Sequence, residues 1–283
     1  MIREVKSEPS ADYALGGTET ELTRLRSQAQ EYETSARWLL DQIGVQAGWK
    51  VLDVGCGPIG ILALLSERVG PEGAVVGLER EPRFVELAKR EVARLDLRNV
   101  TIVQADALHS GLDSDSFDLV HERLVMVNVP ERRGLLAQML RLTAPGGTIA
   151  LEDIDNVSWL CEPEHDSWNA LISAFHGAFR GAGGDPFIGR RLPSLLREAG
   201  VVQIRAHLQA ELPQPGQYRR THLISLVDSI REKIIAQGLV DEQELESHRK
   251  ALLEHLADPN TLVIEKLLMQ CWGRKPASAP ATD

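Results

Sequence analysis

The 283-residue sequence has few cysteines, few aromatic residues and no long apolar run. Its three cysteines, Cys56, Cys161 and Cys271, lie far apart and without metal-ligand spacing, so we expect no disulfide and no structural zinc. No stretch of about 18 apolar residues is present, which argues against a membrane-spanning helix. Residues 1–10 are charged and lack the apolar core of a secretion signal. These absences predict a cytoplasmic protein without a membrane partner.

Positive charge is also scarce, since 31 Lys and Arg residues stand against 41 Asp and Glu residues, for a formal net charge of −10. Nucleic-acid binding needs a basic face. The arginines at 190–191 and 219–220 are isolated pairs rather than patches. We therefore predict no nucleic-acid partner. The sequence shows no H-x-E-x-x-H spacing or similar carboxylate–histidine pattern, so we also predict no metal.

What the sequence does contain is an apolar strand pattern that runs into a G-x-G-x-x-G turn, VLDVGCGPIG at 51–60. Glycines allow a sharp turn and a close approach of the backbone to a ligand, and the next helix opens with free N–H donors. Nineteen residues beyond Gly60, Glu79 ends a second apolar segment. A carboxylate at this point of a βαβ unit accepts both ribose hydroxyls of a bound nucleoside. The pair predicts a nucleoside-bearing cofactor, either NAD or S-adenosylmethionine (SAM).

Strand and helix patterns alternate through the first half of the chain. We predict strands at 50–54, 74–79, 99–104, 117–121 and 147–153, and helices at 59–69, 81–95 and 131–142. Such alternation implies a parallel, doubly wound sheet with its ligand at the carboxyl ends of the strands. Asp106 follows the third of these strands, where it is placed to accept a hydrogen bond from an adenine amino group.

Five ordered motifs make the chain resemble the class I SAM-dependent methyltransferases, within them the small-molecule branch that includes ubiquinone- and menaquinone-type enzymes. The motifs are VLDVGCGPIG, the acidic strand end at Glu79, QADA at 104–107, SFDLV at 116–120 and APGGTIALED at 144–153. The resemblance implies an α/β fold with a doubly wound, seven-stranded Rossmann-like sheet, N-terminal helices and a helical lid. It also implies SAM as cofactor and S-adenosylhomocysteine (SAH) as product.

The same resemblance implies which residues hold the cofactor. Tyr13 would fold over its methionine end, Gln28 would reach its carboxylate from the leading helix, and Arg123 would lie near its methionine portion. An N-terminal arm that packs on a neighbouring subunit is the other interpretation of the segment around Tyr13. The full predicted set is Tyr13, Gln28, Asp53, Gly55, Gly57, Gly60, Glu79, Arg80, Asp106, Ala107, Glu122 and Arg123.

Acidic residues at the end of the fifth strand are candidates for the chemistry at the acceptor. Side chains alternate along a strand, so Asp153 and Asp155 share one face and Glu152 lies on the other. We predict catalytic roles for Asp155, Glu152 and His176. The histidines at 165 and 222 are further candidate bases, and each histidine is alternatively a surface or core residue.

The chain divides by composition and pattern into seven segments. They are an N-terminal arm and cap helices at 1–48, a SAM-binding core at 49–155, a helical lid at 156–191, a core helix and strand at 192–212, a second helical lid at 213–260, an antiparallel strand at 261–273 and a disordered tail at 274–283. Aromatic residues at 159, 168 and 179 either wall the acceptor or belong to the core. Homo-oligomers could form through the N-terminal arm or the lid helices.

The predicted function is transfer of a methyl group from SAM to a small organic acceptor by in-line SN2 displacement, with O- and C-methylation both open and a place in specialised metabolism. SAM carries its own leaving group, so the protein has to align the acceptor and exclude water. One alternative is a SAM-binding protein of the same fold with a non-transfer role, such as cyclisation or regulation, because fold does not determine function. A less favoured alternative is an NAD-dependent dehydrogenase, which rests only on the glycine motif and Glu79.

Overall fold

The computed structural model describes residues 25, 31–58 and 60–277. Tyr13 and Gln28 lie outside these residues, so their predicted contacts with the cofactor stay predictions.

A seven-stranded sheet with the strand order β3-β2-β1-β4-β5-β9-β7 forms the centre of the fold. Its first five members are parallel, and β9 runs antiparallel to both β5 and β7. The strands are β1 Lys50–Val54, β2 Ala74–Glu79, β3 Val100–Gln104, β4 Phe117–Arg123, β5 Thr143–Asp155, β7 Val202–Gln209 and β9 Leu267–Arg274. The predicted doubly wound sheet is confirmed.

Helices cover both faces of this sheet because successive side chains of its buried strands point to opposite sides. One face meets α2 Glu33–Ile43, α3 Leu62–Val69 and α4 Pro82–Arg94, and the other meets α5 Arg132–Leu142 and α7 Leu192–Glu198. In β1, for example, Val51 packs with α2 and α3, whereas Leu52 packs with α5. The predicted helix at 59–69 is shorter than expected, because the glycine turn continues to Gly60 and α3 begins at Leu62.

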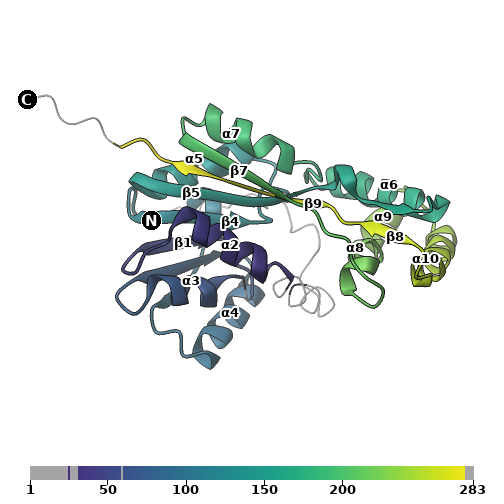
Figure 1. The fold of residues 1–283 in the computed structure, drawn as a ribbon, viewed down its shortest axis with the longest axis horizontal. Coiled ribbons are helices and arrows are strands. Elements are labelled where there is room, and N and C mark those ends of the chain that lie inside the picture. The colour runs from purple at the N-terminus through teal and green to yellow at the C-terminus, as the bar shows by residue number, and fades with distance from the viewer. Residues whose placement is uncertain (1–24, 26–30, 59, 278–283) are drawn as a thin grey trace, which may run out of the picture.

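A helical layer lies beyond the carboxyl ends of the parallel strands, at the right of Figure 1. It consists of α6 Asp166–Gly181, α8 His222–Ser229, α9 Arg231–Ala236, α10 Glu242–Ala257 and a two-stranded sheet of β6 Leu160–Glu162 and β8 Leu262–Ile264. α6 contacts α8, α9 and α10, so the two segments predicted as lids pack together as one layer. Residues 218–236 of the segment predicted as a second lid form a 3-10 turn and two helices, α8 and α9.

The antiparallel strand predicted near 261–272 is in fact two strands, and this is a correction. β8 pairs with β6 in the small sheet, and β9 enters the large sheet. The two strands are separated by Glu265 and Lys266, which belong to neither strand and whose side chains are buried. The backbone of Glu265 bonds elsewhere, because its N–H donates to the carbonyl of Glu211 and its carbonyl accepts from the Ser158 hydroxyl.

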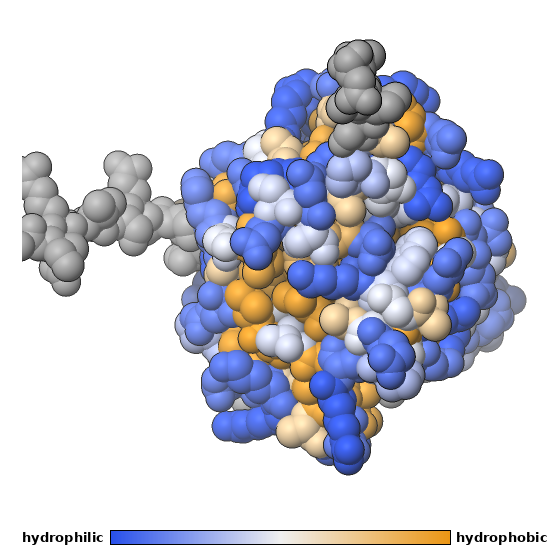
Figure 2. Space-filling view, turned by 90° about the vertical axis from the view of Figure 1, so that its left-hand side faces the viewer, coloured by the Kyte–Doolittle hydropathy of each residue, from blue (hydrophilic) through white to orange (hydrophobic). Residues whose placement is uncertain are grey.

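Figure 2 shows the end of the molecule opposite the helical layer, where hydrophilic residues surround a smaller hydrophobic area. The predicted site residues of the core lie toward the other end, at the carboxyl ends of the strands. Within the part of the chain that the structure describes, no helix has the length and apolar character needed to cross a bilayer.

Candidate functional site

The turn after β1 depends on its glycines. Gly55, Gly57 and Gly60 have φ angles of 66°, 59° and 48°, a region that side chains disfavour. A Cβ atom on Gly55 would also press on the side chain of Val125, and one on Gly60 would press on the carbonyl of Cys56. At Gly57, by contrast, no atom lies within 4 Å of an added Cβ. The turn therefore presents bare backbone to the open space in front of it.

The carboxylate of Glu79 is tied to this turn. Its Oε2 accepts the N–H of Gly57 at 3.0 Å, and its Oε1 accepts those of Arg80 and Glu81, each at 2.8 Å. Burial raises the pKa of Glu79, and the three N–H donors partly offset that rise. The side chain is thus held at the end of β2, beside the glycine turn. Asp106 is held in a similar way, since it accepts the N–H of Leu108 at 2.8 Å.

A cavity of about 340 Å³ runs from the glycine turn to α6 and α8. Its size lies within the range of about 300–1,000 Å³ that is typical of small-molecule sites. It brings together seven of the predicted cofactor residues, Gly55, Gly57, Glu79, Arg80, Asp106, Ala107 and Arg123. A neighbouring cavity of about 70 Å³ shares the glycine turn and adds Asp53, Gly60 and His121.

A chain of buried polar side chains crosses four neighbouring strands below this smaller cavity. Asp53 on β1 lies 2.7 Å from Nδ1 of His121 on β4, and Nε2 of His121 lies 2.9 Å from Glu152 on β5. Gln270 on β9 donates to Glu152 at 2.6 Å and to the carbonyl of Ser35 at 3.0 Å. This set of side chains links Asp53 to α2 through buried groups.

His121 is the positive centre of this chain. Burial by itself lowers the pKa of an imidazole, but the hydrogen bonds and charges of Asp53 and Glu152 outweigh burial and raise the pKa of His121 to about 9. Burial raises the pKa of Glu152, but the hydrogen bond and the charge of His121 outweigh burial. The pKa of Glu152 therefore lies below its ordinary value. At neutral pH the imidazole of His121 is therefore protonated.

A second pair of buried carboxylates supports the loop that follows β4. Glu122 accepts the N–H groups of Val125 and Met126 at 2.9 and 3.3 Å, and Asp153 accepts that of Val127 at 2.8 Å. Burial raises the pKa of Glu122 to about 7 and also raises that of Asp153. Glu122 itself lines neither cavity. It acts on the larger cavity indirectly, because it accepts the backbone N–H of Val125, which does line that cavity.

These shifts predict that stability falls as pH rises. A group whose pKa is higher in the folded state contributes stability below its unfolded pKa and loses it as pH rises through the folded one. For His121 the window runs from 6.5 to about 9, and the loss is about 3 kcal/mol; Glu122 acts in the same direction from 4.5 to about 7. Urea unfolding at several pH values measures the change, and an unfolding free energy that rises across the His121 window would contradict it.

Arg123 is a cation that lines both cavities. Its guanidinium lies 5.8 Å from the ring centroid of Tyr32. The buried Nη1 atom has no hydrogen-bond partner among the described residues. A buried guanidinium nitrogen without an acceptor is costly. Nη1 is therefore a candidate to bind an anionic group of a ligand.

The three predicted catalytic residues lie apart from the cavities. Asp155 accepts two hydrogen bonds of 2.6 Å from Arg190, and Glu152 belongs to the chain described above. His176 pairs with Asn156 at 3.0 Å, and burial with a nearby arginine lowers the pKa of His176 to about 4. None of the three is among the lining residues, so a catalytic role for them stays a prediction.

A different ionic cluster does reach the larger cavity. Nζ of Lys266 lies 3.0 Å from Oε1 of Glu265 and 2.8 Å from Nδ1 of His222. His222 and Lys266 both line the cavity. His222 was predicted only as a further candidate base, and Glu265 and Lys266 were not predicted as site residues. The available signal was a Glu-Lys pair inside an otherwise apolar strand pattern, TLVIEKLLM at 261–269.

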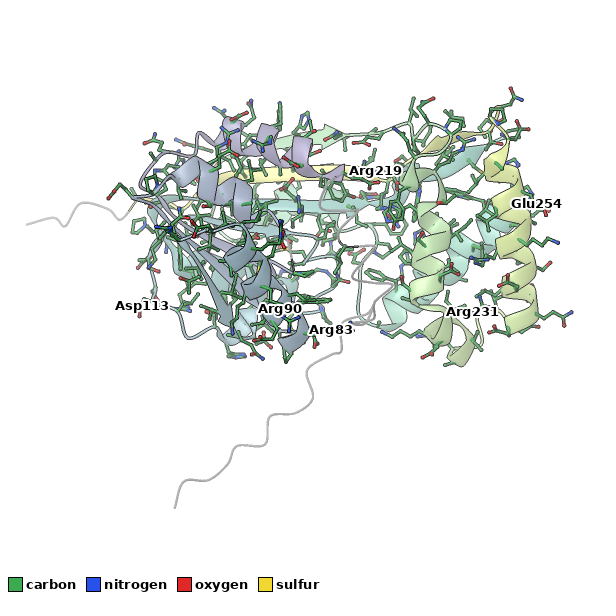
Figure 3. The ribbon with its side chains drawn as sticks, turned by 90° about the horizontal axis from the view of Figure 1, so that it is seen from below. Arg83, Arg90, Asp113, Arg219, Arg231 and Glu254 are labelled. Carbon is green, nitrogen blue, oxygen red and sulfur yellow. The ribbon has the colours of Figure 1, made fainter. Side chains whose placement is uncertain are left out.

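Arg219 joins the helical layer to the N-terminal part of the fold. In Figure 3 it lies where the two parts meet. Its guanidinium bonds Glu31 at 2.9 Å and Glu211 at 2.5 Å, and it lies 4.8 Å from the ring centroid of Tyr32. This contact ties the residues just before α2 to the start of the helical layer. Sequence patterning alone did not suggest it.

The aromatic residues predicted as either core or acceptor wall divide between the two roles. Phe179 lines the cavity, together with Phe175 from the same helix. Trp159 and Trp168 are buried and pack edge to face with ring centroids 5.9 Å apart, outside the lining. They belong to the core of the helical layer.

Comparisons with known proteins match the chain to methyltransferases. A family model described as methyltransferase domain matches residues 46–200. A demethylmenaquinone methyltransferase of Listeria monocytogenes is 31% identical over 131 residues, which cover 46% of this chain and 53% of that protein. A trans-aconitate 2-methyltransferase of Methylobacterium radiotolerans is 30% identical over 196 residues, which cover 68% of this chain and 71% of that protein. The chain therefore spans about half the length of the Listeria relative.

Solved structures agree at the level of the fold. Phosphoethanolamine N-methyltransferase 2 of Haemonchus contortus, determined in complex with SAM, superposes with a TM-score of 0.55 at 18% sequence identity. The match covers 86% of this chain and 53% of that one. At this identity the likeness supports the architecture and not the acceptor.

Proposed function

Because the chain belongs to the methyltransferase-domain family of class I SAM-dependent enzymes, we propose that it transfers a methyl group from SAM to a small organic acceptor. The observation that carries the proposal is the single cavity that joins the glycine turn to the apolar walls of α6 and α8. One space can therefore hold a nucleoside cofactor at one end and an acceptor at the other.

The residues at the glycine-turn end fit SAM. Glu79 offers a fixed carboxylate for the two ribose hydroxyls, and Asp106 is an acceptor for the adenine amino group. The buried Nη1 of Arg123 can bind the methionine carboxylate. Gly57 leaves its backbone open to the ligand. These assignments extend the predicted cofactor set residue by residue.

Bound SAM supplies an electrophilic methyl group on a positively charged sulfur. The protein's part is to hold the acceptor in line with the bond that breaks and to exclude water, which lowers the barrier by orientation. The loop supported by Glu122 and Asp153 lines the cavity and shapes the space between its two ends. For Asp155, Glu152 and His176 we propose positioning roles, since each bonds a protein group rather than facing the cavity.

The acceptor we propose is a small molecule. Two relatives carry the names of enzymes that act on demethylmenaquinone and trans-aconitate. The cavity volume and its apolar walls suit a molecule of modest size. Methylation within specialised metabolism, a cytoplasmic location and assembly into homo-oligomers are further parts of this proposal.

Calorimetric titration with SAM, SAH and NAD, followed by a screen for SAH release with phenols, quinones, polyketides and organic acids, tests the function. We expect SAM and SAH to bind with micromolar-range affinity, NAD not to bind, and SAH to form with an acceptor. Binding of SAM without SAH release across the screen would favour the non-transfer role. Binding of NAD in place of SAM would favour a dehydrogenase and overturn the proposal.

A further inference from the structure

The break between β8 and β9 delivers two charged side chains to a buried position. Glu265 and Lys266 are 2% and 5% exposed, and His222 from the start of α8 is 2% exposed. Burying an ion pair is unfavourable unless its geometry is well satisfied, so it adds little to stability by itself. Here the pair lies between two strands, and Lys266 lines the cavity. Because the pair adds little to stability, this position points to a ligand.

The contacts of Lys266 determine the state of the histidine. A lysine ammonium donates hydrogen bonds and cannot accept them. At 2.8 Å from Lys266 Nζ, the Nδ1 atom of His222 is therefore an acceptor, and the proton of the neutral ring lies on Nε2. Oε2 of Glu265 is farther from Nδ1, at 3.3 Å. Lys266 and His222 are thus both hydrogen-bond donors at the cavity wall.

The cluster is oriented with its positive end toward the cavity. Lys266 and His222 line the cavity, whereas Glu265 does not. Burial raises the pKa of Glu265, but the charge of the neighbouring Lys266 and the hydrogen bond that Lys266 donates outweigh burial and lower that pKa. Glu265 is therefore an anion that forms an ion pair with Lys266 and does not line the cavity.

The surroundings of these two donors are apolar. Phe175, Phe179, Leu226 and Ile154 form the walls of this half of the cavity. The acidic lining residues, Glu79, Glu81, Asp106 and Glu131, come instead from the end of β2 and from the loops after β2, β3 and β4. Among the described residues that line the half formed by α6, α8 and the end of β5, the ionisable side chains are His222 and Lys266.

We propose that His222 and Lys266 bind an anionic oxygen of the acceptor, so that the acceptor is a compact apolar molecule with a carboxylate or an ionised phenol or enol. This inference rests on the proposed methyl transfer and names its substrate class. An oxygen that is already ionised has no proton to lose, so its methylation needs no general base. This agrees with the position of Asp155, Glu152 and His176 outside the cavity lining.

The test uses pairs of probes with the same body and different charge. Cinnamate is compared with cinnamamide for the carboxylate source, and 4-nitrophenolate with 4-nitroanisole for the phenolate source, each titrated into the SAH-loaded protein. We expect the anion of at least one pair to bind about tenfold tighter than its neutral partner, as a charge-assisted hydrogen bond requires. The pair that shows the preference identifies the source.

Three variants locate the effect. Lys266→Met and His222→Gln are expected to reduce the preference to about threefold or less, whereas Lys250→Met, at an exposed lysine of α10, keeps it. No anion preference in the unmodified protein, no binding of any probe, or a preference that survives in both variants would overturn the inference. If Lys266→Met fails to fold, the unmodified protein and His222→Gln still decide. SAM titration of the same samples separates this outcome from failure of the proposed function.

Discussion

Replacing Glu79 with alanine is expected to weaken SAM binding about a hundredfold. Hydrogen bonds to a charged acceptor contribute roughly 1.5–3 kcal/mol each, and the proposed ribose contact contains two of them. The change also removes the acceptor for the N–H groups of Gly57, Arg80 and Glu81, which loosens the turn that the cofactor meets. Calorimetric titration with SAM and with SAH measures the effect.

Two further variants control this experiment. Glu79→Gln keeps an acceptor oxygen and the side-chain length, so we expect a smaller loss of about tenfold. Glu86→Ala removes an exposed carboxylate from α4, which follows β2 directly, and should leave SAM affinity unchanged. Equal SAM affinity for the alanine variant and the unmodified protein, with both folded, would contradict the assignment of Glu79.

Replacing His121 with alanine is expected to lower the free energy of unfolding by about 3–5 kcal/mol. The change leaves Asp53 and Glu152 buried without the cation between them, and breaking a buried ion pair from one side costs about this much. It also removes the link between β1 and β5 across β4. Urea unfolding near neutral pH, where the imidazole is charged, measures the loss.

A matched variant at an exposed histidine tests whether the loss of unfolding free energy comes from the buried polar contacts of His121. His109→Ala removes an exposed histidine in the 3-10 turn after β3 and should change the unfolding free energy by less than about 0.5 kcal/mol. The His121 variant should also lose the decline in stability between pH 6.5 and about 9, because the titrating group is gone. A loss below about 1 kcal/mol for His121→Ala would show that the two carboxylates are accommodated without it.

The parts of the fold that depend on local patterning were predictable. The residues of β2 match the predicted strand at 74–79, and β1 matches that at 50–54, because a short apolar run is a property of the segment itself. The glycine turn was predictable for a related reason, since its positive φ angles restrict which residues can occupy it. Glu79 follows from its place at a strand end.

The polar chain through Asp53, His121, Glu152 and Gln270 was not predictable in the same way. Its members come from four strands that are distant in sequence and adjacent in the sheet, so the contacts exist only once the strand order is set. Of these four residues, Glu152 alone was predicted to be catalytic. In the folded protein its carboxylate is bonded to His121 and Gln270.

The sequence by itself determined the class of the fold, the glycine turn with Glu79 beside it and the family, because these rest on motifs in which neighbouring residues act together. Only the tertiary structure decided which charged residues line the apolar half of the cavity. They are His222 and Lys266 rather than Asp155 and His176, because the interruption between β8 and β9 and the packing of α8 bring residues 44 positions apart to within 2.8 Å. Proximity of this kind is produced by packing and leaves no local pattern in the chain.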